Sequence, residues 1–383
     1  MKTVWRALFS VAVSLGLSAV ACGGVDRGSP RDDGKSSDGG SGAGGAAGSG
    51  GAADSGGVGG SGGVAGSGGV AGSGGSAGTG GVAGSGGSGG DSGTGGSAGS
   101  GGSGGDSGSG GSGGGDVDAG CSGTADYDYT ADIQWTTVPQ YSTNTQYTKT
   151  FQDVMSHCDP GDLNPCNYPL TDPLVAVHEN CHMLNAQITG RAGWGNQQGV
   201  YYKEGAAVVV TIPTTQIPDV APLVPSSIAQ TTPTRFKTYV QDAGQGGTVT
   251  NLGWWMDEMG AYLQNGSMAE ESVLANDFPW NTVCEAEGCI DFVAFNGSSV
   301  IALQTNEPAF LQTNKEYKAS LALLMEACMG LAKRSEALQS DKLLCDSGKQ
   351  MLTLLRSGSD TEGIRDALCA VYGGGWVKRV IGN

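Results

Sequence analysis

One long stretch of the sequence cannot supply a folded core, and it limits what the rest of the chain can form. From Gly23 to about Gly120 the residues are almost wholly Gly, Ser, Ala, Val and Asp, with near-repeats and no aromatic side chain. Such a segment has no hydrophobic period and cannot offset its ordering entropy by burial. We therefore predict a disordered Gly/Ser-rich tether over 22–120 and a single folded domain over 121–383.

The first 21 residues have the features of an export signal. Lys2 and Arg6 give a positive start, an apolar run follows, and Ala19-Val20-Ala21-Cys22 is similar to a bacterial lipoprotein signal, with the lipid on Cys22. An ordinary secretory signal cleaved near Ala21 is the alternative. Both interpretations predict export. The lipoprotein interpretation places the protein at the outer membrane or cell surface, with its domain in extracellular or periplasmic space.

The charge of the chain argues against two kinds of partner. The formal net charge is -17 and the sequence pI is about 4.4, which disfavours nucleic acid and an anionic membrane surface. No apolar run after the signal is long enough to span a bilayer. We therefore expect membrane contact only through the lipid on Cys22, and the oligomeric state stays open.

A histidine motif carries the chemistry of the predicted domain. His178-Glu179-Asn180-Cys181-His182 has the form H-E-x-x-H within an apolar frame, and it holds two of the chain's 3 histidines. On a helix, positions four apart lie on one face, so both histidines can reach one ion while Glu179 holds a water beside it. Asp172 caps the predicted helix, Pro173 suits its first turn and Gly190 ends it. The pattern predicts a catalytic Zn²⁺ site.

A catalytic zinc usually has three protein ligands, and no histidine follows His182. The third ligand is therefore expected to be a carboxylate, with a cysteine as the alternative. Glu258 is favoured because Trp254, Trp255 and Tyr262 surround it on a predicted helix, where an unpaired carboxylate would be expensive. Asp257 and Glu204 remain the alternatives, the latter in a hairpin turn beside Lys203.

The two motifs together, HENCH and the downstream DEMGAY, resemble zincin metallopeptidases of the gluzincin type. The resemblance covers residues 170 to 266 and implies an α+β, zincin-like catalytic domain, mostly helical with a small β-sheet. It also implies His178, His182 and Glu258 as zinc ligands and Glu179 as the general base. Tyr262 stands where one gluzincin variant has Asp, so support for the histidines must come from elsewhere, and Asp257 could provide it.

The predicted reaction is hydrolysis of a peptide bond by a zinc-bound water that Glu179 deprotonates. The developing oxyanion needs a further donor, for which Tyr201, Tyr202 and Tyr262 are the candidates nearest the motifs. His157 is the only other imidazole and is expected to be a surface or packing histidine. Two alternatives stay open: a non-catalytic zinc-containing binding or adhesion lipoprotein, and a zinc hydrolase of a non-peptide amide.

The cysteines indicate disulfides in an exported chain. Of the 10 cysteines, Cys22 is set aside for lipid and Cys181 as a small buried residue in the zinc helix. Close spacing predicts Cys158–Cys166 and Cys284–Cys289. The pairing of the remaining four is open: Cys121, Cys328, Cys345 and Cys369.

Outside the zinc helix the patterns predict four features. Residues 121–150 should be extended or short strands, and 199–212 a hairpin with its turn at Lys203-Glu204-Gly205. A second helix should run over 252–265, capped by Asn251 and closed by Gly266. Residues 314–372 should be helical, with their Leu, Met and Ala side chains in the core.

Overall fold

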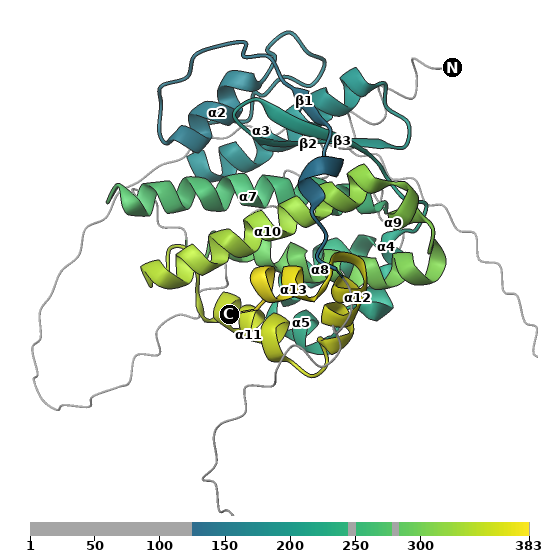
Figure 1. Cartoon of the computed structure of the whole chain (residues 1–383). Helices are drawn as coiled ribbons and strands as arrows, with labels where there is room; N and C mark the ends of the chain where they lie inside the picture. The colour runs from purple at the N-terminus through teal and green to yellow at the C-terminus, as the bar shows by residue number, and fades with distance from the viewer. Residues whose placement is uncertain (1–124, 244–249, 278–282, 383) are drawn as a thin grey trace, which may run out of the picture. The chain divides into compact units, whose positions relative to one another are not determined.

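The structure is a computed structural model that describes residues 125–243, 250–277 and 283–382 (Figure 1). The predicted signal peptide (1–21) and tether (22–120) lie outside these residues, as does Cys121. The described part is mostly helical with a small three-stranded sheet, in agreement with the predicted α+β class. Within it, no helix is both long enough and apolar enough to cross a membrane.

The α-helices are, in chain order, α2 (Lys149–His157), α3 (Pro173–Ala192), α4 (Ile217–Val220), α5 (Ser226–Thr231), α6 (Pro233–Phe236), α7 (Leu252–Leu274), α8 (Glu287–Asn306), α9 (Phe310–Thr313), α10 (Lys315–Leu338), α11 (Asp346–Ser357), α12 (Glu362–Tyr372) and α13 (Gly374–Val380). Two short 3₁₀ helices, η2 (Tyr129–Asp132) and η3 (Ala221–Leu223), and a π-helical turn, η4 (Lys237–Asp242), complete the helical elements of the described part.

The sheet is antiparallel, in the order β1 (Trp135–Thr137), β3 (Ala206–Thr211), β2 (Gln197–Lys203). The predicted hairpin between β2 and β3 is confirmed. Its turn is formed by Glu204 and Gly205, whose φ angles of 50° and 74° are left-handed and therefore suit glycine at the second position. Of the region predicted as extended or short strands, 121–150, the described residues contain one short strand, β1, of three residues, together with the 3₁₀ helix η2, and α2 already begins at Lys149.

The predicted zinc helix is α3. The Asp172 carboxylate accepts hydrogen bonds from the Leu174 and Val175 amides, as a capping residue should. The helix does not end at Gly190. It continues to Ala192, and Gly193, with a φ of 103°, is its C-cap.

Helix α7 is the predicted second helix, but it is longer than the sequence pattern indicated. The Asn251 side chain caps it by accepting from the Trp254 amide. Gly266 does not close it, because the helix continues to Leu274. A Cβ at Gly266 would come within 2.6 Å of Leu331, so this glycine permits close helix packing instead of ending the helix.

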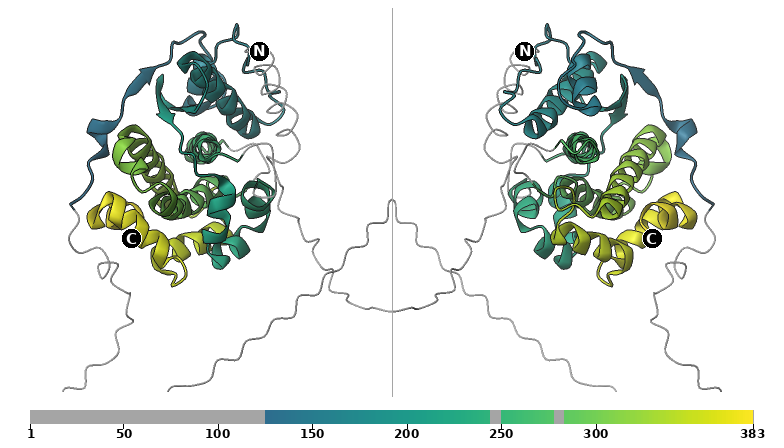
Figure 2. Two further views of the ribbon diagram at one scale, coloured as in Figure 1. Left: turned by 90° about the vertical axis from the view of Figure 1, so that its right-hand side faces the viewer. Right: turned by 90° about the vertical axis from the view of Figure 1, so that its left-hand side faces the viewer.

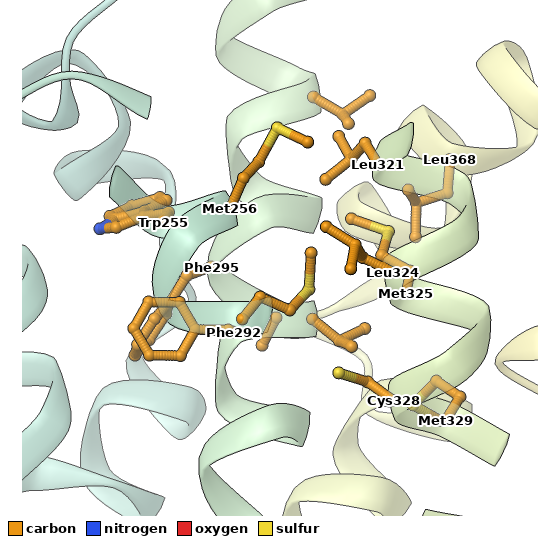
Figure 3. Close-up of a cluster of buried hydrophobic side chains, with 14 of the residues drawn as sticks. Trp255, Met256, Phe292, Phe295, Leu321, Leu324, Met325, Cys328, Met329 and Leu368 are labelled. Carbon is orange, nitrogen blue, oxygen red and sulfur yellow. The ribbon is translucent and has the colours of Figure 1, made fainter. Parts of the chain in front are cut away.

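Helix α7 lies between two parts of the described chain. The sheet, α2 and α3 are on one side of it, and α8 and α10–α13 are on the other (Figures 1 and 2). Its side chains enter both hydrophobic clusters: Met256 and Met259 join the larger helical one, and Ala261 and Met268 join the one shared with α3. In the larger cluster, side chains from α7, α8, α10 and α12 point toward one another (Figure 3). The predicted helical region 314–372 is thus confirmed as core, divided into α10, α11 and α12.

Three disulfides have both ends in the described residues: Cys158–Cys166, Cys284–Cys345 and Cys289–Cys328. The first confirms the prediction, whereas the predicted Cys284–Cys289 bond is wrong. Cys289 points from α8 to Cys328 on α10, and Cys284 instead bonds to the residue that precedes α11. Cys369 is also disulfide-bonded. Disulfides are consistent with passage through an oxidising compartment.

Candidate metal centre

Helices α3 and α7 bring together two imidazoles and a carboxylate. The Nε2 atoms of His178 and His182 are 3.1 Å apart, and the nearest oxygen of Glu258 is 3.7 Å from the first and 3.6 Å from the second. The helices run antiparallel here, because His178 packs against Tyr262 while Asn185 meets Asp257. The three side chains can therefore hold one metal ion between them.

The Glu258 carboxylate shows that these side chains fit a cation. Glu258 is fully buried, and neither of its two oxygens has a hydrogen-bond partner. A buried carboxylate with unpaired oxygens is strongly unfavourable unless a positive charge compensates it. Two nitrogens and one carboxylate oxygen form a donor set that suits zinc.

Asp257 points to His182 and does not join the ligand group. One oxygen is 2.9 Å from His182 Nδ1, and the other accepts from Asn185 Nδ2 at 2.6 Å. With the Nδ1 proton donated to Asp257, the Nε2 lone pair that His182 exposes when it gives up its second proton is directed at His178 and Glu258. Asp257 thus provides the support for a histidine that the sequence left open.

The sheet is fixed to α3 beside this centre. The Tyr201 amide donates to Asn185 Oδ1 at 2.6 Å, and the Gly199 amide donates to Thr189 Oγ1 at 2.8 Å. Asn185 therefore links β2, α3 and Asp257 of α7. The sequence contained a signal for Asn185, since it lies on the same helical face as the two histidines.

The pKa values follow from burial and the neighbouring charges. Burial lowers the pKa of His178 well below its ordinary value, and positive charge on His182 and Arg235 lowers it further. Burial also acts to lower the pKa of His182, but Asp257 and Glu258 outweigh it, so this pKa is well above its ordinary value. Burial raises the pKa of Glu179, which favours proton uptake by this carboxylate.

The other predicted residues lie in different places. Tyr262 is at the centre, with its ring 4.5 Å from that of His178. The Tyr201 hydroxyl instead accepts from the Gly205 amide at 2.9 Å and lies 3.0 Å from His157 Nδ1. The ring of Tyr202 packs against that of Trp135.

The structure also places Glu204 and Cys181, the other side chains near the motifs that could have been the third ligand. Glu204 occupies the β2–β3 turn, where its amide donates to Asp153, so it does not approach the histidines of α3. Cys181 is a buried free thiol, as expected, and burial raises its pKa to about 12. It therefore remains a protonated, inert part of the α3 core.

Two residues beside the centre were not found from the sequence. The Tyr239 hydroxyl of η4 is 3.3 Å from the Tyr262 hydroxyl, and the Arg235 guanidinium of α6 lies over the Tyr262 ring at 5.4 Å. Both come from the proline-rich connection between β3 and α7, whose sequence has no period to place a side chain.

Comparison with known proteins gave no match: no protein-family model, curated protein or solved structure is similar to this chain. The chemistry of the centre therefore has to be argued from its own residues.

Replacing Asp257 by asparagine should weaken zinc binding about 10- to 100-fold, because the hydrogen bond that orients His182 and raises its basicity is weakened. The substitution should also lower the pKa of His182, since Asp257 is a main cause of its elevation. Zinc binding at neutral pH should then release fewer protons than in the wild type. Isothermal titration in buffers of different ionisation enthalpy measures both quantities. Unchanged affinity and proton release would contradict this assignment.

Proposed function

We propose that the chain is a zinc-dependent metallopeptidase that is exported and tethered at the cell surface by lipid on Cys22. The ligands are His178, His182 and Glu258, and Glu179 is the general base. The observation that carries the proposal is the buried Glu258 carboxylate, whose unpaired oxygens face two imidazole nitrogens beside a second buried glutamate. The α3–α7 pair, with a small sheet against α3, supports the zincin-like fold that the motifs imply.

Bound zinc would acidify a water molecule and polarise the substrate carbonyl. Glu179 lies next to His178 on α3, and burial raises its pKa, so it is suited to take a proton from the attacking water. The same carboxyl group then passes the proton to the leaving amine. Because Glu179 is only 3% exposed, its proton would move within a site from which bulk water is largely excluded.

The donor to the developing oxyanion is assigned to Tyr262. Burial raises the pKa values of Tyr262 and Tyr239, so both phenols keep their protons. Their hydroxyls are 3.3 Å apart, and one can therefore orient the other. The Tyr201 hydroxyl is engaged with the β2–β3 turn, which makes it the weaker candidate.

A second candidate function is a non-catalytic zinc-containing binding protein. The burial of the centre favours it, since His178 and His182 are 4% and 3% exposed and structural zinc sites are closed. Glu179 favours the enzyme, because a structural site needs no base next to its first ligand. A zinc hydrolase acting on a non-peptide amide would use the same residues.

Metal analysis of the purified protein tests the ligand set. We expect about one zinc per wild-type chain and near-complete loss in Glu258→Ala, because two histidines alone bind zinc weakly. Glu204→Ala is the matched control and should retain its zinc, since Glu204 lies in the hairpin turn. No zinc in the wild type after metal addition would overturn the proposal. Zinc without hydrolysis of any member of a mixed peptide library would favour the binding protein.

A further inference from the structure

Arg235 is a fixed cation at the edge of the candidate metal centre. Its Nη1 donates to Asp291 Oδ2 of α8 at 2.8 Å, and Thr232 Oγ1 donates to the same oxygen at 2.7 Å. Asp291 is nearly inaccessible, with 4% of its side chain exposed, whereas 29% of the Arg235 side chain is exposed. The anchor is therefore buried, whereas the Arg235 side chain is partly exposed.

The same arginine is close to the metal ligands. Its Cζ lies 5.4 Å from the Tyr262 ring, which is itself 4.5 Å from the His178 ring. These two contacts keep the guanidinium within about 10 Å of the His178 imidazole. That distance corresponds to roughly two to three residues of an extended peptide.

The interactions of Arg235 within the protein do not use its full hydrogen-bonding capacity. A guanidinium has five N–H donors in a planar fork, and here Asp291 and Tyr262 are its partners. The N–H donors that these two partners leave unused are available to a ligand. Among ligand groups, a carboxylate matches this geometry best, because it can accept two parallel N–H bonds.

We propose that Arg235 is a specificity-determining residue that binds the C-terminal carboxylate of a short peptide whose scissile carbonyl lies at the metal centre. This inference rests on the proposed function and adds a substrate class to it. A chain with a formal net charge of -17 repels acidic ligands in general. A fixed cation beside the centre would overcome that repulsion at one position only, and so would select the end of a peptide.

The test measures binding and does not require turnover. The full chain is loaded with Co²⁺ and titrated with 3-mercaptopropionate and, separately, with 3-mercaptopropionamide. Both probes offer a thiolate to the metal, but only the first offers a carboxylate to Arg235. The thiolate-to-cobalt absorption band reports affinity, and we expect the carboxylate probe to bind at least about tenfold more tightly.

Variants assign the preference to the side chain. Arg235→Gln should remove it, Arg235→Lys should retain part of it, and Arg334→Gln, which alters an arginine paired with Glu270, should leave it unchanged. In the Glu179→Gln background, a blocked dipeptide with a free C-terminus should displace the probe better than its amide. An amide with an aspartate as its last residue distinguishes a side-chain carboxylate from the terminal one.

The outcomes separate the two proposals. Failure of the wild type to bind cobalt would overturn the metal centre and, with it, the role of Arg235. Cobalt binding with equal affinity for the two thiols would overturn only the role of Arg235, whether or not the Arg235 variants fold. Preference for the aspartyl amide over the free acid would overturn the assignment to the C-terminal carboxylate.

Discussion

Replacing Glu179 by glutamine is expected to lower kcat for peptide hydrolysis about 1,000-fold while leaving zinc bound. Glutamine keeps the shape of the side chain but cannot take a proton from the attacking water. Because Glu179 is not one of the three side chains that would bind the metal, the metal content should stay at the wild-type value. Hydrolysis of a fluorogenic peptide and elemental analysis of the same sample measure the two quantities.

The control for this substitution is Glu362→Gln. Glu362 is an exposed acid in the first turn of α12, so its loss should leave activity unchanged. A zinc-loaded Glu179→Gln protein with wild-type kcat would remove Glu179 from the mechanism. Loss of zinc together with loss of activity would show that Glu179 is required to form the centre.

The largest expected effect on stability is that of Phe292→Ala, which should lower the free energy of unfolding by about 3–5 kcal/mol. Phe292 is fully buried on α8, close to Phe295 of the same helix (Figure 3). Its ring contacts those of Tyr239, Tyr262 and Phe295 at centroid distances of 5.0, 5.6 and 5.5 Å. Truncation leaves a cavity behind the two tyrosines of the centre. Chemical denaturation with the disulfides intact measures the loss.

Two further variants define what that result means. Leu163→Ala removes a side chain that is 82% exposed and should change the free energy of unfolding by less than about 0.5 kcal/mol. Phe292→Leu keeps most of the volume and should have a smaller effect than Phe292→Ala. A change below about 1 kcal/mol in Phe292→Ala would mean that the cavity closes by rearrangement.

The elements nearest the centre could be predicted because their sequence signals are local. Asp172 and Asn251 each cap a helix by accepting a hydrogen bond from a backbone amide at most three residues further along the chain. The Glu204-Gly205 turn connects two strands that are adjacent in sequence. Glu258 could be favoured as the third ligand from its aromatic neighbours, because a buried carboxylate without a compensating positive charge is strongly unfavourable. These signals were enough to predict that the two helices, α3 and α7, contribute to one site.

The predictions that were wrong concern contacts between distant segments. Glycine is typical of a helix end, but Gly266 lies within α7 and lets Leu331 of another helix pack closely against it. Cys284 and Cys289 are close in sequence, yet their partners are set by the packing of α8 on α10 and by the approach to α11. Arg235 and Tyr239 reach the centre through an aperiodic connection, and only the three-dimensional arrangement shows it.

No disulfide between described residues links α3 to α7, so a bound metal ion would be a cross-link between these two helices. Cys158–Cys166 lies before α3, and Cys284–Cys345 and Cys289–Cys328 lie after α7, so none of these three bonds joins the two ligand-bearing helices. An ion held by His178, His182 and Glu258 would connect α3 to α7. Chelation should therefore increase amide hydrogen exchange in α3 and α7 while the disulfide-bonded helices stay protected. Occupancy by metal would thus set how often the two parts of the domain separate, independently of the redox state of the surroundings.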